Sequence, residues 1–123
     1  MDIAYKRYRK PILWIKTGHF GEDRAKWIRY VTDECREALL NGTDLRGICI
    51  YPVIDCPDWD ELSSYSNCGL WDLNNEKERI LNENYYAVVQ TCMAEISNLE
   101  SMHIQDNMNN NLSLSIEVTK GYQ

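Results

Sequence analysis

The stretch PILWIKTGHFGEDRAKWIRYV, residues 11–31, contains the change of pattern that decides the fold. Residues 12–15 are continuously apolar, which is typical of a short strand buried on both faces of a parallel sheet. Residues 18–21 begin and end with glycine and indicate a turn, and the acidic pair at 22–23 favours the start of a helix. The stretch therefore predicts a strand, a turn and a helix, with Lys16 at the end of the strand.

The same pattern continues along the chain. The helix is expected to end at Asn41-Gly42, because glycine is favoured just beyond a helix C-terminus, and residues 47–51 form a second apolar run that predicts a strand. Residues 55–79 are polar and turn-rich and predict a long loop, which a final helix follows. The apolar face of that helix is expected to carry Tyr85, Val88, Cys92, Ile96 and Leu99. Strands that alternate with helices indicate an α/β fold with parallel pairing.

The two ends of the chain lie outside this pattern. Residues 2–9 are expected to be the end of a helix, so that residues 1–102 form one structural unit. Residues 103–123 are rich in asparagine and predict a mobile tail, although the alternating stretch LSLSIEV at 112–118 is compatible with a strand. Two strands are too few for an independently stable sheet, so the sequence indicates the last quarter or third of a larger structure.

Composition argues against several classes of function. The net charge of −6 argues against a nucleic-acid partner. No apolar run is long enough to span a membrane, so we expect no membrane partner. The first ten residues lack the apolar core of a secretory signal. The five cysteines are an odd number without CxxC spacing, so reduced thiols in a cytoplasmic protein are the simplest interpretation. With only two histidines, we expect no metal and no other cofactor.

Three segments occur in order along the chain: PILWIKTG at 11–18, LRGICIYPVIDCPDWD at 45–60 and GLWDLN at 69–74. Together they resemble the C-terminal end of family 1 glycoside hydrolases, which are (β/α)8 barrels, or TIM barrels, that cleave β-glycosides with retention of configuration. The first segment resembles the seventh strand, the second resembles the eighth strand with its loop, and the third resembles a turn after it. The resemblance implies a partial barrel with these two strands and their helices.

The resemblance also implies where catalysis would occur. Retaining glycosidases use two carboxyl groups, one as a nucleophile and one as an acid and base. In the family the nucleophile is the glutamate that ends the seventh strand, and Lys16 stands at this position. The acid/base glutamate belongs to the fourth strand, which this sequence does not contain. Because an ammonium group cannot act as the carboxylate nucleophile, we expect no glycosidase activity.

Two further interpretations of Lys16 remain open. A lysine at the end of a barrel strand can form a Schiff base with a carbonyl substrate, as in aldolases. Alternatively, the lysine is a substitution that is tolerated because selection for hydrolysis has ended. The second interpretation is the simpler one, because the other segments resemble those of sugar hydrolases.

Several positions are expected to bind sugar because they match the family. Tyr51 replaces a tryptophan that packs near the sugar ring, and Asp58 and Trp59 match a Glu-Trp pair that binds sugar hydroxyls. Asp55 matches the aspartate of the family's D-N-F-E-W segment. For each of these residues the alternative is a role in loop packing. His19 could line the same pocket, although a surface histidine is the simpler interpretation.

Three functional hypotheses follow. The first is a β-glucosidase-like protein that is truncated or inactive and whose partner, if any, is a β-glycoside. The second is a non-catalytic module for carbohydrate binding or assembly. The third is a partial barrel that assembles with a complementary barrel half. Because the apolar faces of so small a sheet would lack partners, we also expect self-association or a loosely packed state.

Overall fold

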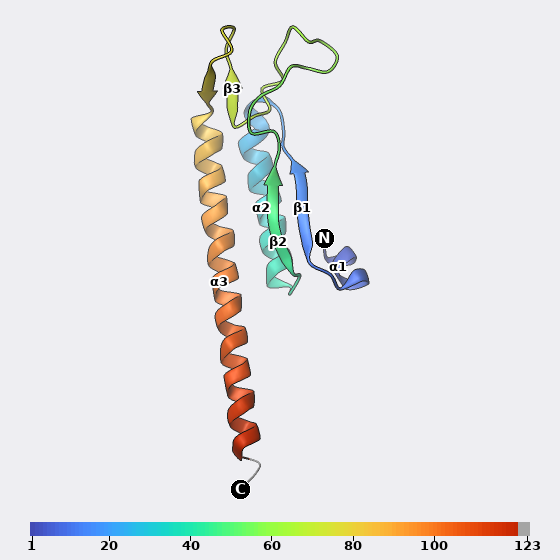
Figure 1. Cartoon of the computed structure of the whole chain (residues 1–123), viewed down its shortest axis with the longest axis vertical. Coiled ribbons are helices and arrows are strands. Elements are labelled where there is room, and N and C mark those ends of the chain that lie inside the picture. Colours follow the sequence, from blue (N-terminus) through green and yellow to red (C-terminus); the bar gives the residue numbers. More distant parts are fainter. Residues whose placement is uncertain (121–123) are drawn as a thin grey trace.

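The computed structural model describes residues 1–120, together with their side chains except those of 103, 107 and 110–120. The helices are α1 (Asp2–Tyr8), α2 (Arg24–Leu40) and α3 (Glu83–Lys120), and a short 3-10 helix, η1 (Gly21–Asp23), precedes α2 (Figure 1). The strands are β1 (Ile12–Thr17), β2 (Leu45–Ile50), β3 (Trp71–Leu73) and β4 (Arg79–Leu81). No helix in this part of the chain has the length and apolarity that a membrane span requires.

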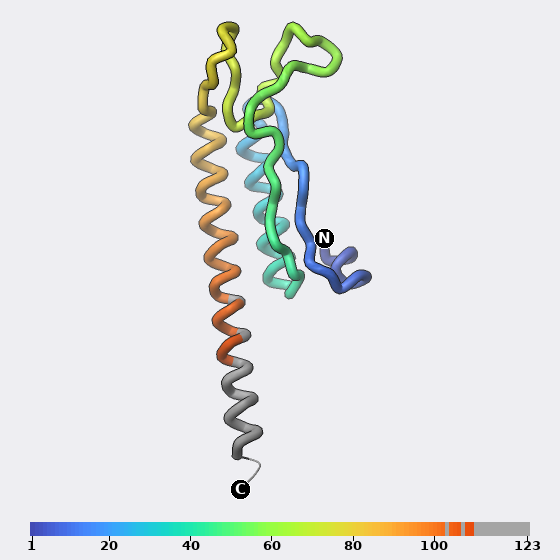
Figure 2. The backbone as a smooth tube through the Cα atoms, in the orientation of Figure 1, coloured from blue at the N-terminus to red at the C-terminus, as the bar shows by residue number. Residues whose placement is uncertain are grey.

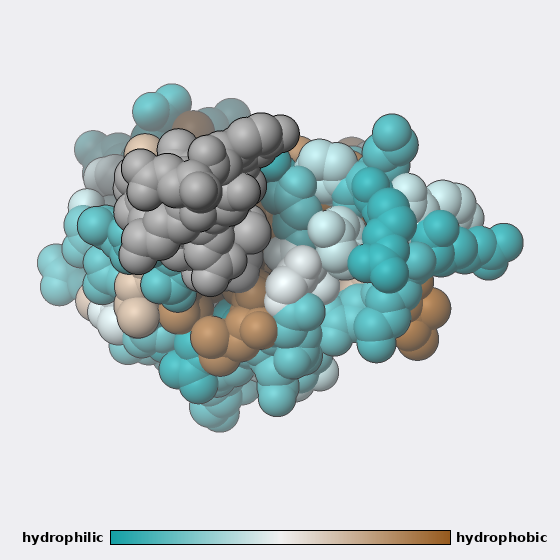
Figure 3. Space-filling view, turned by 90° about the horizontal axis from the view of Figure 1, so that it is seen from below, coloured by the Kyte–Doolittle hydropathy of each residue, from teal (hydrophilic) through white to brown (hydrophobic). Residues whose placement is uncertain are grey.

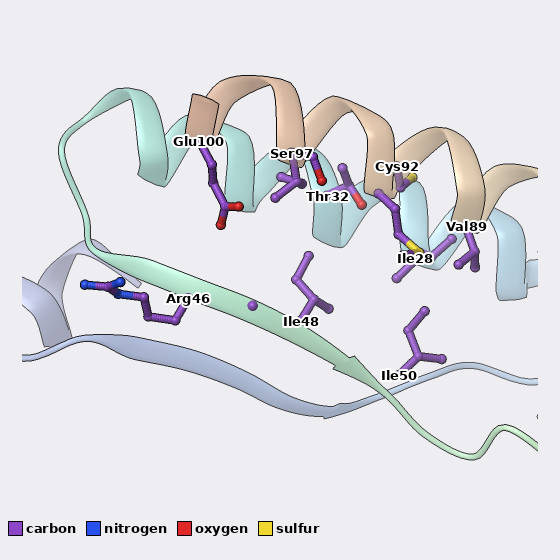
Figure 4. A pocket seen from close by; sticks show the side chains of 12 residues that line it. Ile28, Thr32, Arg46, Ile48, Ile50, Val89, Cys92, Ser97 and Glu100 are labelled. Carbon is purple, nitrogen blue, oxygen red and sulfur yellow. The ribbon is translucent and has the colours of Figure 1, made fainter. Parts of the chain in front are cut away.

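Strands β1 and β2 pair in parallel, and α2 is the crossover between them. This arrangement confirms the predicted strand, helix and strand. Gly42 follows Asn41, the C-cap of α2, and its φ of 83° is the left-handed conformation that glycine tolerates at the end of a helix. Helices α2 and α3 pack against each other and cover one face of the strand pair (Figures 1 and 4).

The core lies between the two helices and the sheet. One buried cluster joins α2 to α3 through Ile28, Tyr85 and Val89. A second cluster joins α2 to β2 through Val31, Cys35 and Leu45. The predicted apolar face of the last helix is confirmed at Tyr85 and Cys92, which are both buried. On the other face of β1, Leu13 and Ile15 are exposed, and no helix in the described part of the chain covers them.

The long loop expected for residues 55–79 is interrupted by a hairpin. Strand β3 pairs antiparallel with β4, and Trp71 lies opposite Leu81. The hairpin turn is closed at Asn74, whose side-chain oxygen accepts a hydrogen bond from the backbone N–H of Glu78 at 2.8 Å. GLWDLN is therefore partly strand rather than only a turn. Each strand has only three residues, so the alternation of apolar and polar residues that marks a strand could not be recognised in the sequence.

The C-terminal stretch belongs to a helix. Because α3 extends to Lys120, residues 112–118 are helical and the suggested strand there is wrong. Most side chains of the expected mobile tail, 103–123, lie outside the described residues, so its mobility stays a prediction.

The two ends of the sheet differ in character. The arrows in Figure 1 show the direction of β1 and β2, and Figures 1 and 2 show that the loop after β2 and the β3–β4 hairpin both project from the end towards which these strands run. Figure 3 views the molecule from the opposite end, and the part of this end that grey atoms do not cover is mainly hydrophilic with smaller apolar patches. In α/β barrels the carboxyl ends of the strands carry the functional residues, so the loop end is where a site is expected.

Candidate functional site

Lys16 lies at the carboxyl end of β1 in an unusual backbone conformation. Its φ is 55°, and the register of β1 against β2 shifts between Trp14 and Thr17. Such an irregularity redirects a side chain from the regular alternation of a strand. The ammonium nitrogen lies 5.3 Å from the ring centroid of Tyr51, which directly follows β2. This distance is within the range of a cation–π interaction.

Hydrogen bonds next to Lys16 hold the carboxyl ends of β1 and β2 together. The carbonyl oxygen of Thr17 accepts a hydrogen bond from the backbone N–H of Tyr51 at 3.0 Å. The buried hydroxyl of Thr17 accepts another at 2.8 Å from the indole N–H of Trp27, which connects the strand end to α2. At Gly18 a Cβ atom would collide with the carbonyl group of Tyr51, so only glycine fits there.

A pocket of about 240 Å³ opens at these strand ends. Tyr51, Trp59 and Lys16 line it together with His19, for which the sequence favoured a surface position, and their contact with sugar stays a prediction. Among the described residues no aspartate or glutamate lines the pocket, whose remaining walls are Gly18, Phe20, Pro52, Cys56, Ser66 and Cys68. The pocket therefore combines aromatic surface and one ammonium group without a carboxylate.

Asp55 does not line this pocket, because its carboxylate is directed into the base of the loop. The residue is only 5% exposed. One carboxylate oxygen accepts hydrogen bonds from the backbone N–H groups of Cys56 and Cys68, and the other accepts one from that of Asn67 at 3.1 Å. In this structure Asp55 fastens the two ends of the loop, and a contact with sugar stays a prediction.

Two cysteines lie beside this carboxylate. The Sγ atoms of Cys56 and Cys68 are 3.9 Å apart, and Cys68 Sγ is 3.4 Å from Asp55 Oδ1. Burial, followed by the hydrogen bonds with Asp55 and Cys56, raises the pKa of the Cys68 thiol to about 12. The sequence contained no sign of this cluster, since residues twelve apart match no common metal-ligand spacing.

Asp58 and Trp59 lie further along the same loop. The side chain of Asp58 accepts a hydrogen bond from the backbone N–H of Asp60 at 2.8 Å, which forms a local turn. Trp59 is 93% exposed, so most of its ring is available to a ligand. Of the pair expected to bind sugar, only Trp59 reaches the strand-end pocket.

A buried arginine connects the hairpin to the start of α2. Arg24 is 3% exposed, and its guanidinium donates to the carbonyl oxygen of Gly69 at 2.7 Å and to the two carboxylate oxygens of Asp72 at 2.6 and 3.2 Å. It also donates to the carbonyl oxygen of Gly21. Sequence reasoning missed this pair because Arg24 and Asp72 are 48 positions apart and no local pattern relates them.

Comparison with known proteins supports this architecture. No family model and no curated protein sequence matches the chain. Among solved structures, it matches the beta-glucosidase 1317 over 76% of its length with a TM-score of 0.60 and 19% identity. It matches Fpglu1 from Fervidobacterium pennivoraus over 76%, with a TM-score of 0.61 and 22% identity. The family 1 b-glucosidase from Thermotoga maritima is matched over 71%, with a TM-score of 0.55 and 16% identity.

These matches establish the fold class as that of part of a β-glucosidase barrel. The chain spans only 24%, 21% and 23% of the lengths of these three structures. The resemblance to family 1 glycoside hydrolases is thereby confirmed for the fold. The parallel strands and their helices form a piece of that barrel architecture.

Proposed function

We propose that this chain is a segment of a β-glycosidase-like barrel that binds a sugar at its strand ends without hydrolysing it. In this proposal β1 and β2 correspond to the seventh and eighth strands of the barrel. The observation that carries it is the strand-end pocket, where Tyr51 and Trp59 supply aromatic surface and Lys16 supplies an ammonium group. The similarity of fold to β-glucosidases supports a carbohydrate as the ligand.

The chemistry of the pocket explains why binding is proposed without hydrolysis. A retaining glycosidase needs two carboxyl groups about 5 to 5.5 Å apart, and no described residue supplies one to this pocket. The ammonium group of Lys16 would also oppose the positive charge that develops on the sugar ring. It can still donate hydrogen bonds to hydroxyl oxygens. Tyr51 and Trp59 offer ring faces against which the C–H groups of a sugar can pack.

The first prediction is that the purified chain does not hydrolyse an aryl β-glucoside. Lys16→Glu should be equally inactive, because one restored carboxylate still lacks an acid/base partner. Release of 4-nitrophenol from 4-nitrophenyl β-glucoside measures the hydrolysis rate, and an active family 1 β-glucosidase is the positive control. Turnover by the unmodified chain that disappears in Lys16→Ala would overturn the proposal of inactivity.

The second prediction concerns sugar binding itself. Addition of glucose or cellobiose should change the tryptophan fluorescence of the chain, and Trp59→Ala should abolish the change because Trp59 lines the pocket. Trp71→Phe is the matched control, since Trp71 lies in β3 and does not line this pocket. Unchanged fluorescence at millimolar sugar, or a response that survives Trp59→Ala, would contradict a role of this pocket in binding.

A second candidate function, assembly, is favoured by the uncovered face of the sheet. Leu13 and Ile15 are 57% and 61% exposed on the face of β1 that points away from α2. On the other side, an open groove of about 250 Å³ lies between β2, α2 and α3, with Ile48 and Ile50 directed into it (Figure 4). We propose that further barrel strands and their helices cover these surfaces.

The third prediction is that the isolated chain self-associates through the face of β1 that exposes Leu13 and Ile15. Leu13→Lys should shift the chain towards the monomer, because it places a charge where two such faces would meet. Ile80→Lys is the control, since Ile80 is similarly exposed, at 52%, but lies in β4. Size-exclusion chromatography with light scattering measures the mass. A monomer that unfolds cooperatively would contradict the prediction.

A further inference from the structure

Three potential metal ligands meet at the base of the loop, and the proposed sugar site does not explain them. The carboxylate of Asp55 and the thiols of Cys56 and Cys68 place their ligand atoms within 4.8 Å of one another. Asp55 and Cys68 are buried, while Cys56 is half-buried. Buried sulfur and carboxylate groups that converge in this way differ from the scattered acidic groups of a protein surface.

Two of the three separations between these atoms are close to those of a tetrahedral zinc site. Zinc binds thiolate sulfur at about 2.3 Å and carboxylate oxygen at about 2.0 to 2.2 Å, so tetrahedral angles place two sulfur atoms about 3.8 Å apart and sulfur and oxygen about 3.5 to 3.7 Å apart. The observed separations are 3.9 Å between Cys56 Sγ and Cys68 Sγ and 3.4 Å between Cys68 Sγ and Asp55 Oδ1. Cys56 Sγ and the Asp55 carboxylate lie within 4.8 Å of each other, so this pair would draw together around the ion.

We propose that Asp55, Cys56 and Cys68 bind one Zn²⁺ ion, with the fourth position open to the strand-end pocket. Both cysteines line that pocket, so water or a ligand can reach the ion from it. Two thiolates select a borderline-soft ion such as zinc over magnesium or calcium, which prefer oxygen ligands. Three protein ligands with one open position are also the arrangement found in catalytic rather than structural zinc sites.

Binding requires the two thiols to lose their protons. Each sulfur releases one proton to solvent and forms one bond to zinc, so the ion is bound with the release of two protons and without any change of oxidation state. The hydrogen bond between the Cys68 thiol and Asp55 is then replaced by the two bonds to the metal. The backbone N–H groups of Cys56, Asn67 and Cys68 already orient the carboxylate and would support it as a ligand.

The ion would connect the two ends of the loop. Residues 57–67 lie between the two cysteines, and they include Trp59. A metal bound at 55, 56 and 68 would therefore close this loop beside the pocket. The inference stands on the geometry of the cluster alone and does not depend on sugar binding.

The test uses the full chain, kept reduced with a phosphine, and Co²⁺ as a spectroscopic probe for the zinc site. One equivalent of Co²⁺ should produce a thiolate-to-cobalt charge-transfer band, and Zn²⁺ should displace it. Cys56→Ser and Cys68→Ser should abolish the band and raise the dissociation constant for Zn²⁺, measured against a chromophoric chelator, by about tenfold or more. Cys49→Ser is the matched control, because Cys49 is an exposed cysteine of β2 outside the cluster.

Two results would overturn the proposal. One is the absence of the charge-transfer band in the reduced chain. The other is a band that persists unchanged in Cys56→Ser, which would assign binding to other thiols. Because Cys56 is half-buried, its replacement by serine should preserve the fold, and far-ultraviolet circular dichroism checks this.

Discussion

Replacement of Arg24 with methionine should lower the free energy of unfolding by about 3 to 5 kcal/mol. The side chain of Arg24 is only 3% exposed and bonds to both carboxylate oxygens of Asp72, whose side chain is 25% exposed. Methionine would leave this carboxylate without its partner and the carbonyl oxygen of Gly69 without its donor. The guanidinium also lies 5.9 Å from the ring centroid of Tyr85, so its loss would loosen the contact between α2 and α3.

Urea unfolding followed by circular dichroism measures this change. Lys26→Met is the matched control, because Lys26 lies in the same helix and pairs with Asp23 on the surface, where its side chain is 82% exposed. An exposed pair of this kind contributes little to stability, so the control should unfold close to the unmodified chain. Equal losses in the two variants would show that the buried pair does not stabilise the fold.

Asp55→Ala should also be strongly destabilising, by about 2 to 4 kcal/mol. The change removes the acceptor for the backbone N–H groups of Cys56, Asn67 and Cys68 at once. At least the N–H of Cys68 is buried, so water cannot readily replace the carboxylate. Both ends of the loop should therefore separate at the same time.

Hydrogen exchange distinguishes this opening from general instability. Under native conditions the amides of Asn67 and Cys68 should exchange much faster in Asp55→Ala, while those in the middle of α2 keep most of their protection. Asp58→Ala is the control, because its carboxylate accepts only from the exposed N–H of Asp60. If Asp58→Ala accelerated hydrogen exchange at Asn67 and Cys68 as much as Asp55→Ala does, the proposed role of Asp55 in holding the loop closed would be wrong.

The strand, helix and strand could be predicted because their signals are local. Residues 12–15 and 47–51 are apolar runs of strand length, and Gly42 marks the end of the helix between them. Such features depend on neighbours in the chain, so they are present in the sequence before any tertiary contact forms. The same holds for the position of Lys16 at the strand end.

The remaining features depend on contacts between distant residues. The β3–β4 hairpin is stabilised by strand pairing and by the bonds of Asp72 with Arg24, and neither leaves a periodic pattern in three-residue strands. The family resemblance predicted sugar contact for Asp55, but it could not show that the backbone of Asn67 and Cys68 would surround that carboxylate. The sequence did not indicate the cysteine pair for the same reason, since only the folding of the loop brings the two sulfur atoms together.

The fastening of the loop at its base also determines where the chain can vary in length. The hydrogen bonds of Asp55 define both ends of the loop, while Trp59 and Leu62 at its tip are 93% and 79% exposed. Residues added or lost at the tip would leave the base unchanged, because surface loop tips tolerate insertion and nicking better than the elements they connect. In evolution this tip is therefore the place where related chains can diverge in length without a change in the two strands below it.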